Sequence, residues 1–152
     1  MCAIQGDIME NSKMRVLFIC VYNSFRSQVA EAFLNHKYGD KFIAESAGYK
    51  TKEINPIAIE VMKEKGYDIA NNSINRVFDY YNEGRSYQYV VTVCNRESEG
   101  DCPICPGNVI RLHWDGLDNP EEFIGTNEEK LEKARNLCND IEKRVDEFVK
   151  II

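Results

Sequence analysis

The first feature with chemical potential is the heptapeptide Cys20-Val-Tyr-Asn-Ser-Phe-Arg26. Its cysteine and arginine are separated by five residues, a spacing that lets a short loop fold its amides around a tetrahedral oxyanion. The thiol then lies beneath the anion, and the planar guanidinium of Arg26 can bind two oxygens at once. Because a thiolate under a bound oxyanion is a nucleophile, this spacing predicts nucleophilic chemistry on that anion.

The position in the chain singles out Cys20, because two other cysteines have an arginine at the same distance. These pairs are Cys105 with Arg111 and Cys138 with Arg144. Cys138 lies in a predicted amphipathic helix whose amides are already bonded, and the stretch from Cys105 leads into a predicted strand. Only Cys20 ends a buried strand and is followed by a helix, so that loop amides and the helix N-terminus face one place.

We expect the loop amides, Arg26 and the Ser27 hydroxyl to keep Cys20 ionised as a thiolate near neutral pH. The predicted oxyanion-binding residues are Val21, Tyr22, Asn23, Ser24, Phe25 and Arg26. The alternative is structural: a buried cysteine at a strand end, with a solvated arginine nearby.

The apolar pattern predicts strands that alternate with helices. Short apolar runs indicate strands at 15–19, 42–46, 89–93 and 109–113. Helices are expected at 26–38, from Pro56 to Gly66, and from a Thr126/Glu129 capping box to about residue 149. This order implies an α/β fold in three layers, with a four-stranded parallel sheet flanked by helices. Ligands bind such sheets beyond the carboxyl ends of the strands, where the loop after residue 19 lies.

The length and composition fit one catalytic domain. Of the 152 residues, we expect 1–13 to form a loose N-terminal extension and 14–152 a single domain. The net charge of −6 opposes binding to nucleic acids or anionic lipids. No run is apolar enough for a membrane span or a signal peptide, and six cysteines are too few for a disulfide scaffold. These features favour a protein that is located in the reducing cytoplasm.

Residues 20–28, followed by Glu45-Ser-Ala-Gly48, resemble the low-molecular-weight protein tyrosine phosphatases and the thioredoxin-coupled arsenate reductases built on that fold. The resemblance extends from about Met14 to the final helix. It implies the roles of nucleophile for Cys20, oxyanion clamp for Arg26, thiolate partner for Ser27 and loop organiser for Asn23. Tyr22 departs from the family, whose loops usually have glycine there, so we expect it to shift the loop or cap the site.

Three further cysteines separate reductase from phosphatase. Segments 90–94, 102–106 and 112–114 resemble the second half of the arsenate reductases. That resemblance implies that Cys94 attacks the adduct of Cys20 with arsenic and releases arsenite. Cys102 then attacks the Cys20–Cys94 disulfide, and thioredoxin reduces the resulting Cys94–Cys102 disulfide. Cys105 remains an alternative to Cys102 in the last step.

The expected proton donor is displaced in this chain. The family normally has an aspartate directly before the proline in the loop after the fourth strand, but Asn119 precedes Pro120 here. Its neighbour Asp118 is therefore our candidate acid. The tyrosine pair that often follows this proline in the phosphatases is also absent from residues 121–123. Both differences favour the reductase.

These observations predict an arsenate reductase that acts through Cys20, Cys94 and Cys102, uses thioredoxin and contributes to arsenical resistance. No cofactor and no metal ion are expected. One alternative is a low-molecular-weight tyrosine phosphatase with a Cys20 phosphoenzyme. The other is a thiol-switch or zinc-bearing binding module, in which Cys94, Cys102, Cys105 and His113 supply the zinc ligands.

Overall fold

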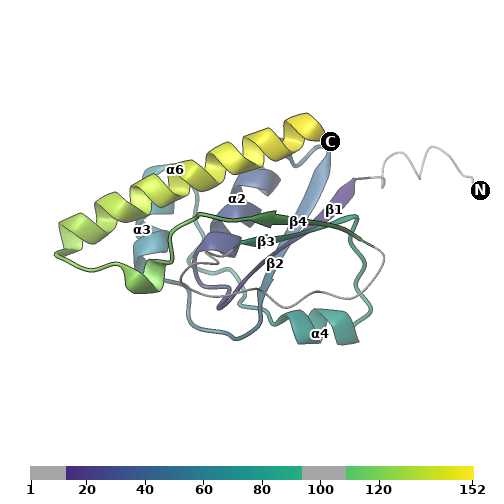
Figure 1. Ribbon diagram of the computed structural model, residues 1–152, viewed down its shortest axis with the longest axis horizontal. Helices are drawn as coiled ribbons and strands as arrows, with labels where there is room; N and C mark the ends of the chain where they lie inside the picture. Colours follow the sequence, from purple (N-terminus) through teal and green to yellow (C-terminus); the bar gives the residue numbers. More distant parts are fainter. Residues whose placement is uncertain (1–12, 94–108) are drawn as a thin grey trace, which may run out of the picture.

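The computed structural model describes residues 13–93 and 109–152. The elements in chain order are β1 (Met14–Cys20), α2 (Arg26–Tyr38), β2 (Phe42–Gly48), α3 (Pro56–Glu64), α4 (Val77–Asn82), β3 (Tyr89–Val93), β4 (Ile110–Trp114), the 3-10 turn η1 (Pro120–Glu122) and α6 (Asn127–Ile151) (Figure 1). Cys94, Cys102 and Cys105 lie outside the described residues, as does the predicted extension apart from Lys13.

The four strands form one parallel sheet in the order β2-β1-β3-β4, which confirms the predicted fold class. Strand β1 lies inside the sheet, where Cys20 pairs with Gly48 of β2 and Ile19 pairs with Thr92 of β3. Since the strands are parallel, the carboxyl ends of β1, β2 and β3 meet at one edge. The loop that starts after Cys20 therefore lies at the edge where such sheets bind ligands.

Side chains alternate across the sheet along β1, and the two faces have different partners. Val16 and Phe18 belong to the core formed with α2, α3 and α6, which lie together on one side of the sheet (Figure 1). Leu17 and Ile19 face the other side, in a smaller cluster that contains Tyr80 of α4. Both faces of β1 are thus buried, as its continuous apolar run predicts.

The predicted elements are present with shifted ends. The strands predicted at 15–19 and 42–46 are longer and end at Cys20 and Gly48, and α3 stops at Glu64 before the left-handed Gly66 (φ 93°). The capping box of α6 is present, with Thr126 and Glu129 bonded reciprocally. Helix α4 was not predicted, because six residues are too few for a helical period to show in the sequence. Within the described ranges no helix is both long and apolar enough to cross a membrane.

Candidate active site

The loop between β1 and α2 is held from outside by the segment that follows β2. Lys50 N–H donates to the Val21 carbonyl at 2.9 Å, Lys52 N–H to the Tyr22 carbonyl at 3.3 Å, and Asn55 N–H to the Ser24 carbonyl at 2.9 Å. In a trans peptide the carbonyl and the next N–H point in opposite directions. The N–H groups of residues 22, 23 and 25 therefore point away from this segment, and the N–H of Asn23 donates to Cys20 Sγ at 3.3 Å.

Asn23 fixes the shape of this loop. Its backbone is left-handed (φ 56°), a conformation that asparagine tolerates better than most residues. Its side-chain oxygen accepts from the Asn75 N–H at 2.8 Å, and its amide donates to the hydroxyls of Ser27 at 2.8 Å and Ser46 at 2.9 Å. The side chain is fully buried. These bonds offset the cost of the left-handed backbone. They are consistent with the role of loop organiser that the family resemblance implies for Asn23.

The sulfur of Cys20 has two hydrogen-bond partners. Its sulfur lies 2.9 Å from Ser27 Oγ and accepts the Asn23 N–H at 3.3 Å. Because Ser27 Oγ accepts from the Asn23 amide, the hydroxyl proton of Ser27 is available to the sulfur. Two hydrogen-bond donors therefore converge on this sulfur. Cys20 itself is only 2% exposed.

A carboxyl group that the sequence analysis did not single out ends this network. The Ser46 hydroxyl donates to Glu31 Oε1 at 2.5 Å and accepts from Asn23. Burial raises the pKa of Glu31 to about 7, the charge of Glu45 adds to the rise, and the Ser46 hydrogen bond opposes it. The chain Glu31–Ser46–Asn23–Ser27–Cys20 thus joins a titratable carboxyl of α2 to the sulfur.

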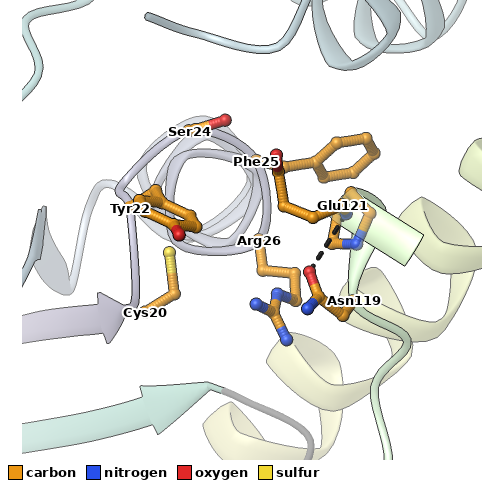
Figure 2. A pocket seen from close by; sticks show the side chains of 8 residues that line it. Cys20, Tyr22, Ser24, Phe25, Arg26, Asn119 and Glu121 are labelled. Atoms are coloured by element: carbon orange, nitrogen blue, oxygen red, sulfur yellow. Dashed lines mark hydrogen bonds between the residues drawn. The ribbon is translucent and has the colours of Figure 1, made fainter. Parts of the chain in front are cut away.

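A narrow pocket opens above Cys20, with a cavity volume of about 10 Å³. Its lining residues are Cys20, Tyr22, Ser24, Phe25, Arg26, Asn119, Pro120 and Glu121 (Figure 2). Arg26 is 3% exposed and is the first residue of α2. Its side chain and the N-terminus of the helix therefore both lie at the pocket, where they favour an anion. Of the predicted oxyanion-binding residues, Tyr22, Ser24, Phe25 and Arg26 line the pocket.

The loop after β4 reaches the pocket through Asn119 and Glu121. Asn119 Oδ1 accepts the Glu121 N–H at 3.0 Å and caps η1. The predicted acid Asp118 is exposed, and the lining residues of this loop are those that follow it. Its role as proton donor stays a prediction.

The relay and zinc predictions concern cysteines outside the described residues. Strand β3 ends at Val93, which pairs with Trp114 of β4. His113 Nδ1 lies 2.6 Å from Thr92 Oγ1. In the described part of the chain, no cluster of three or more histidine, cysteine or acidic side chains could hold a metal ion.

Cys138, the remaining described cysteine, has a different environment. It is fully buried in α6, and burial raises the pKa of its thiol to about 12. This sulfur therefore stays protonated and serves to pack the core.

Residues 15–151 match the sequence profile of the low molecular weight phosphotyrosine protein phosphatases, which covers nearly the whole chain. The chain belongs to this family. This match confirms the resemblance to the phosphatase family that the sequence indicates from about Met14 to the final helix. Named arsenate reductases are among the relatives within it: the arsenate reductase of Bacillus subtilis is 37% identical over 134 residues, which are 88% of this chain and 93% of the relative.

Solved structures of arsenate reductases have the same fold. The crystal structure of an arsenate reductase from Archaeoglobus fulgidus superposes with a TM-score of 0.69 at 26% identity, over 89% of this chain and 98% of that one. The thioredoxin-dependent arsenate reductase of Corynebacterium glutamicum superposes with a TM-score of 0.66 at 29% identity, over 91% of this chain and 61% of that one.

Proposed function

We propose that this chain is an arsenate reductase of the phosphatase family. The observation that carries the proposal is the convergence of the Asn23 N–H and the Ser27 hydroxyl on Cys20 Sγ, beneath a pocket that Arg26 lines. This arrangement suits a thiolate that attacks a bound tetrahedral oxyanion. The relatives named arsenate reductases support arsenate as that anion.

The first two steps transfer two electrons from sulfur to arsenic. The Cys20 thiolate attacks arsenic(V) and displaces one oxygen as water, which leaves a sulfur–arsenic bond. The Cys94 thiolate then attacks Cys20 Sγ and forms the Cys20–Cys94 disulfide. The electron pair of the broken sulfur–arsenic bond stays on arsenic, which departs as arsenite.

The remaining steps restore the nucleophile. Cys102 attacks the sulfur of Cys94, so that the Cys94–Cys102 disulfide forms and Cys20 leaves as a thiolate. A thioredoxin dithiol then reduces this disulfide. The thioredoxin-dependent relative supports this partner, and a reducing cytoplasm fits a relay that starts from free thiols. Asp118 is the proposed donor of the proton for the departing oxygen.

Family membership gives one competing function, hydrolysis of phosphate monoesters through a Cys20 phosphoenzyme. That reaction needs Cys20 and Arg26 but neither Cys94 nor Cys102. The presence of Asn119 where the family usually has an aspartate argues against it, because the amide cannot donate an acidic proton.

Steady-state assays of arsenite formation with thioredoxin, thioredoxin reductase and NADPH test the proposal. We expect turnover in the native chain and none in the Cys20→Ser or Cys94→Ser variants. Undiminished phosphatase activity in Cys94→Ser, with no arsenite formed by the native chain, would favour the competing function.

A further inference from the structure

Lys52 joins the two walls of the pocket. Its Nζ lies 4.3 Å from the centroid of the Tyr22 ring and donates to Glu121 Oε1 at 2.6 Å. Tyr22 comes from the loop after β1 and Glu121 from η1, and both line the pocket (Figure 2). The three side chains therefore form a bridge along the rim, which we name the Lys52 bridge.

The bridge is positioned by the backbone of the loop. The Lys52 N–H donates to the carbonyl of Tyr22, so the lysine is held next to the tyrosine that its ammonium contacts. The ring faces a cation at a distance typical of a cation–π interaction. At the other end, the ammonium neutralises the carboxylate of Glu121, which would otherwise repel an anion in the pocket.

The bridge has different consequences for two classes of ligand. A free oxyanion is compact, and all its oxygens can lie between the loop amides and Arg26. A monoester carries an organic group on one oxygen, and this group must leave the pocket across the rim. Because Tyr22 and Glu121 both line the narrow pocket and Lys52 joins them, the bridge stands in the way of that group.

From this geometry we propose that the Lys52 bridge is a specificity element that admits free oxyanions and excludes their organic esters. The proposal rests on the proposed function, since it names the substrate class of the same pocket. It also assigns a role to Tyr22: its ring anchors the bridge over the site. Discrimination here comes from a steric and electrostatic barrier against the wrong ligand.

Equilibrium binding of two unreactive ligands tests the proposal without any turnover. Inorganic phosphate represents the free oxyanion, and phenylphosphonate represents the ester. We expect Lys52→Met, and separately Glu121→Gln, to lower the ratio of the phenylphosphonate Kd to the phosphate Kd by about tenfold or more, as measured by calorimetry. Glu64→Gln is the matched control, because it removes an exposed pair, Glu64–Arg135 at 3.0 Å, between α3 and α6.

Three results would overturn the proposed role of the Lys52 bridge. One is an unchanged ratio in both variants. The second is an equal loss of affinity for both ligands in Lys52→Met, which would show that the lysine favours any anion in the pocket and does not exclude esters. The third is the same change of ratio in Glu64→Gln. Failure of arsenite formation in the native chain would instead overturn the proposed function, since these binding constants do not depend on it.

Discussion

The side-chain amide of Asn23 donates to the Ser27 hydroxyl at 2.8 Å, and the same hydroxyl lies 2.9 Å from Cys20 Sγ. One asparagine thus sets the orientation of the group that stabilises the sulfur and, through its own N–H, donates to the same sulfur at 3.3 Å. Asn23 therefore contacts both the sulfur and the hydroxyl, although it is not among the residues that line the pocket.

Replacement of Asn23 by alanine should therefore misplace the loop and the Ser27 hydroxyl together. We expect kcat/KM for arsenate reduction to fall by up to about 100-fold, since small displacements of reacting groups have costs of that size. Asn35→Ala is the matched control, because Asn35 exchanges hydrogen bonds of 3.0 and 2.8 Å with the backbone of Ala44 in the core. The measurement is kcat/KM of both variants at a temperature where both are folded. An equal loss of kcat/KM in the two variants would show that Asn23→Ala acts by lowering stability.

The raised pKa of Glu31 predicts a pH-dependent stability. The folded chain keeps this proton up to about pH 7, whereas the unfolded chain loses it near the ordinary value of 4.5. The folded state thus binds more protons in this window, and its stability falls as the pH rises from about 4.5 to about 7, by at most about 3 kcal/mol. Below about pH 4.5 the contribution of the protonated Glu31 to the stability of the folded state is fully present.

Glu31→Gln should remove that pH dependence and keep the acceptor for the Ser46 hydroxyl. The free energy of unfolding in urea, measured at about pH 5 and about pH 7.5, gives the comparison. The difference between the native chain and the variant isolates Glu31 from the other carboxyls. Identical slopes in the two proteins would show that Glu31 does not titrate in this range.

Gly48 is expected to accept no side chain. A Cβ there would lie 2.7 Å from the backbone nitrogen of Asn23 and 2.8 Å from the carbonyl carbon of Tyr22. Gly48→Ala should push the loop away from β2 and lower kcat/KM far more than it lowers stability. Gly84→Ala is the control, because Gly84 has a φ of +72° but no described atom within 4 Å of the added Cβ. We expect that variant to lose about 1 kcal/mol of stability and to retain its activity.

The two described cysteines should differ in reactivity. In the folded chain, iodoacetamide should modify Cys20 and leave Cys138 intact, because burial raises the pKa of the Cys138 thiol to about 12. Bound phosphate should slow the modification of Cys20. Peptide mapping by mass spectrometry measures both rates, and rapid labelling of Cys138 under native conditions would contradict its structural role.

Local patterns in the sequence were sufficient to predict much of the fold and the core of the site. The loop from Cys20 to Ser27 is contiguous, so its residue types and its place between a strand and a helix were readable without coordinates. The capping box of α6 is similarly local, with Thr126 and Glu129 only three positions apart.

Contacts between distant residues could not be predicted in this way. Glu31 and Ser46 are 15 positions apart, and Lys52 and Glu121 are 69 apart. Glu31 meets Ser46 because α2 packs beside β2. Lys52 meets Glu121 because the segments after parallel strands lie at one sheet edge. Lysines and glutamates are common on any solvated surface, so nothing in the sequence marks Lys52 and Glu121 as partners. The prediction for Asp118 came from its neighbour Asn119. The residues of this loop that line the pocket are Asn119, Pro120 and Glu121.

A single turnover without thioredoxin tests the central claim most directly. The fully reduced chain is mixed with arsenate, arsenite is quantified, and the disulfides are mapped by mass spectrometry. We predict about one arsenite per chain and a Cys94–Cys102 disulfide, with no arsenite from Cys20→Ser. Arsenite formation that persists in Cys20→Ser, or that leaves all cysteines reduced in the native chain, would contradict the account.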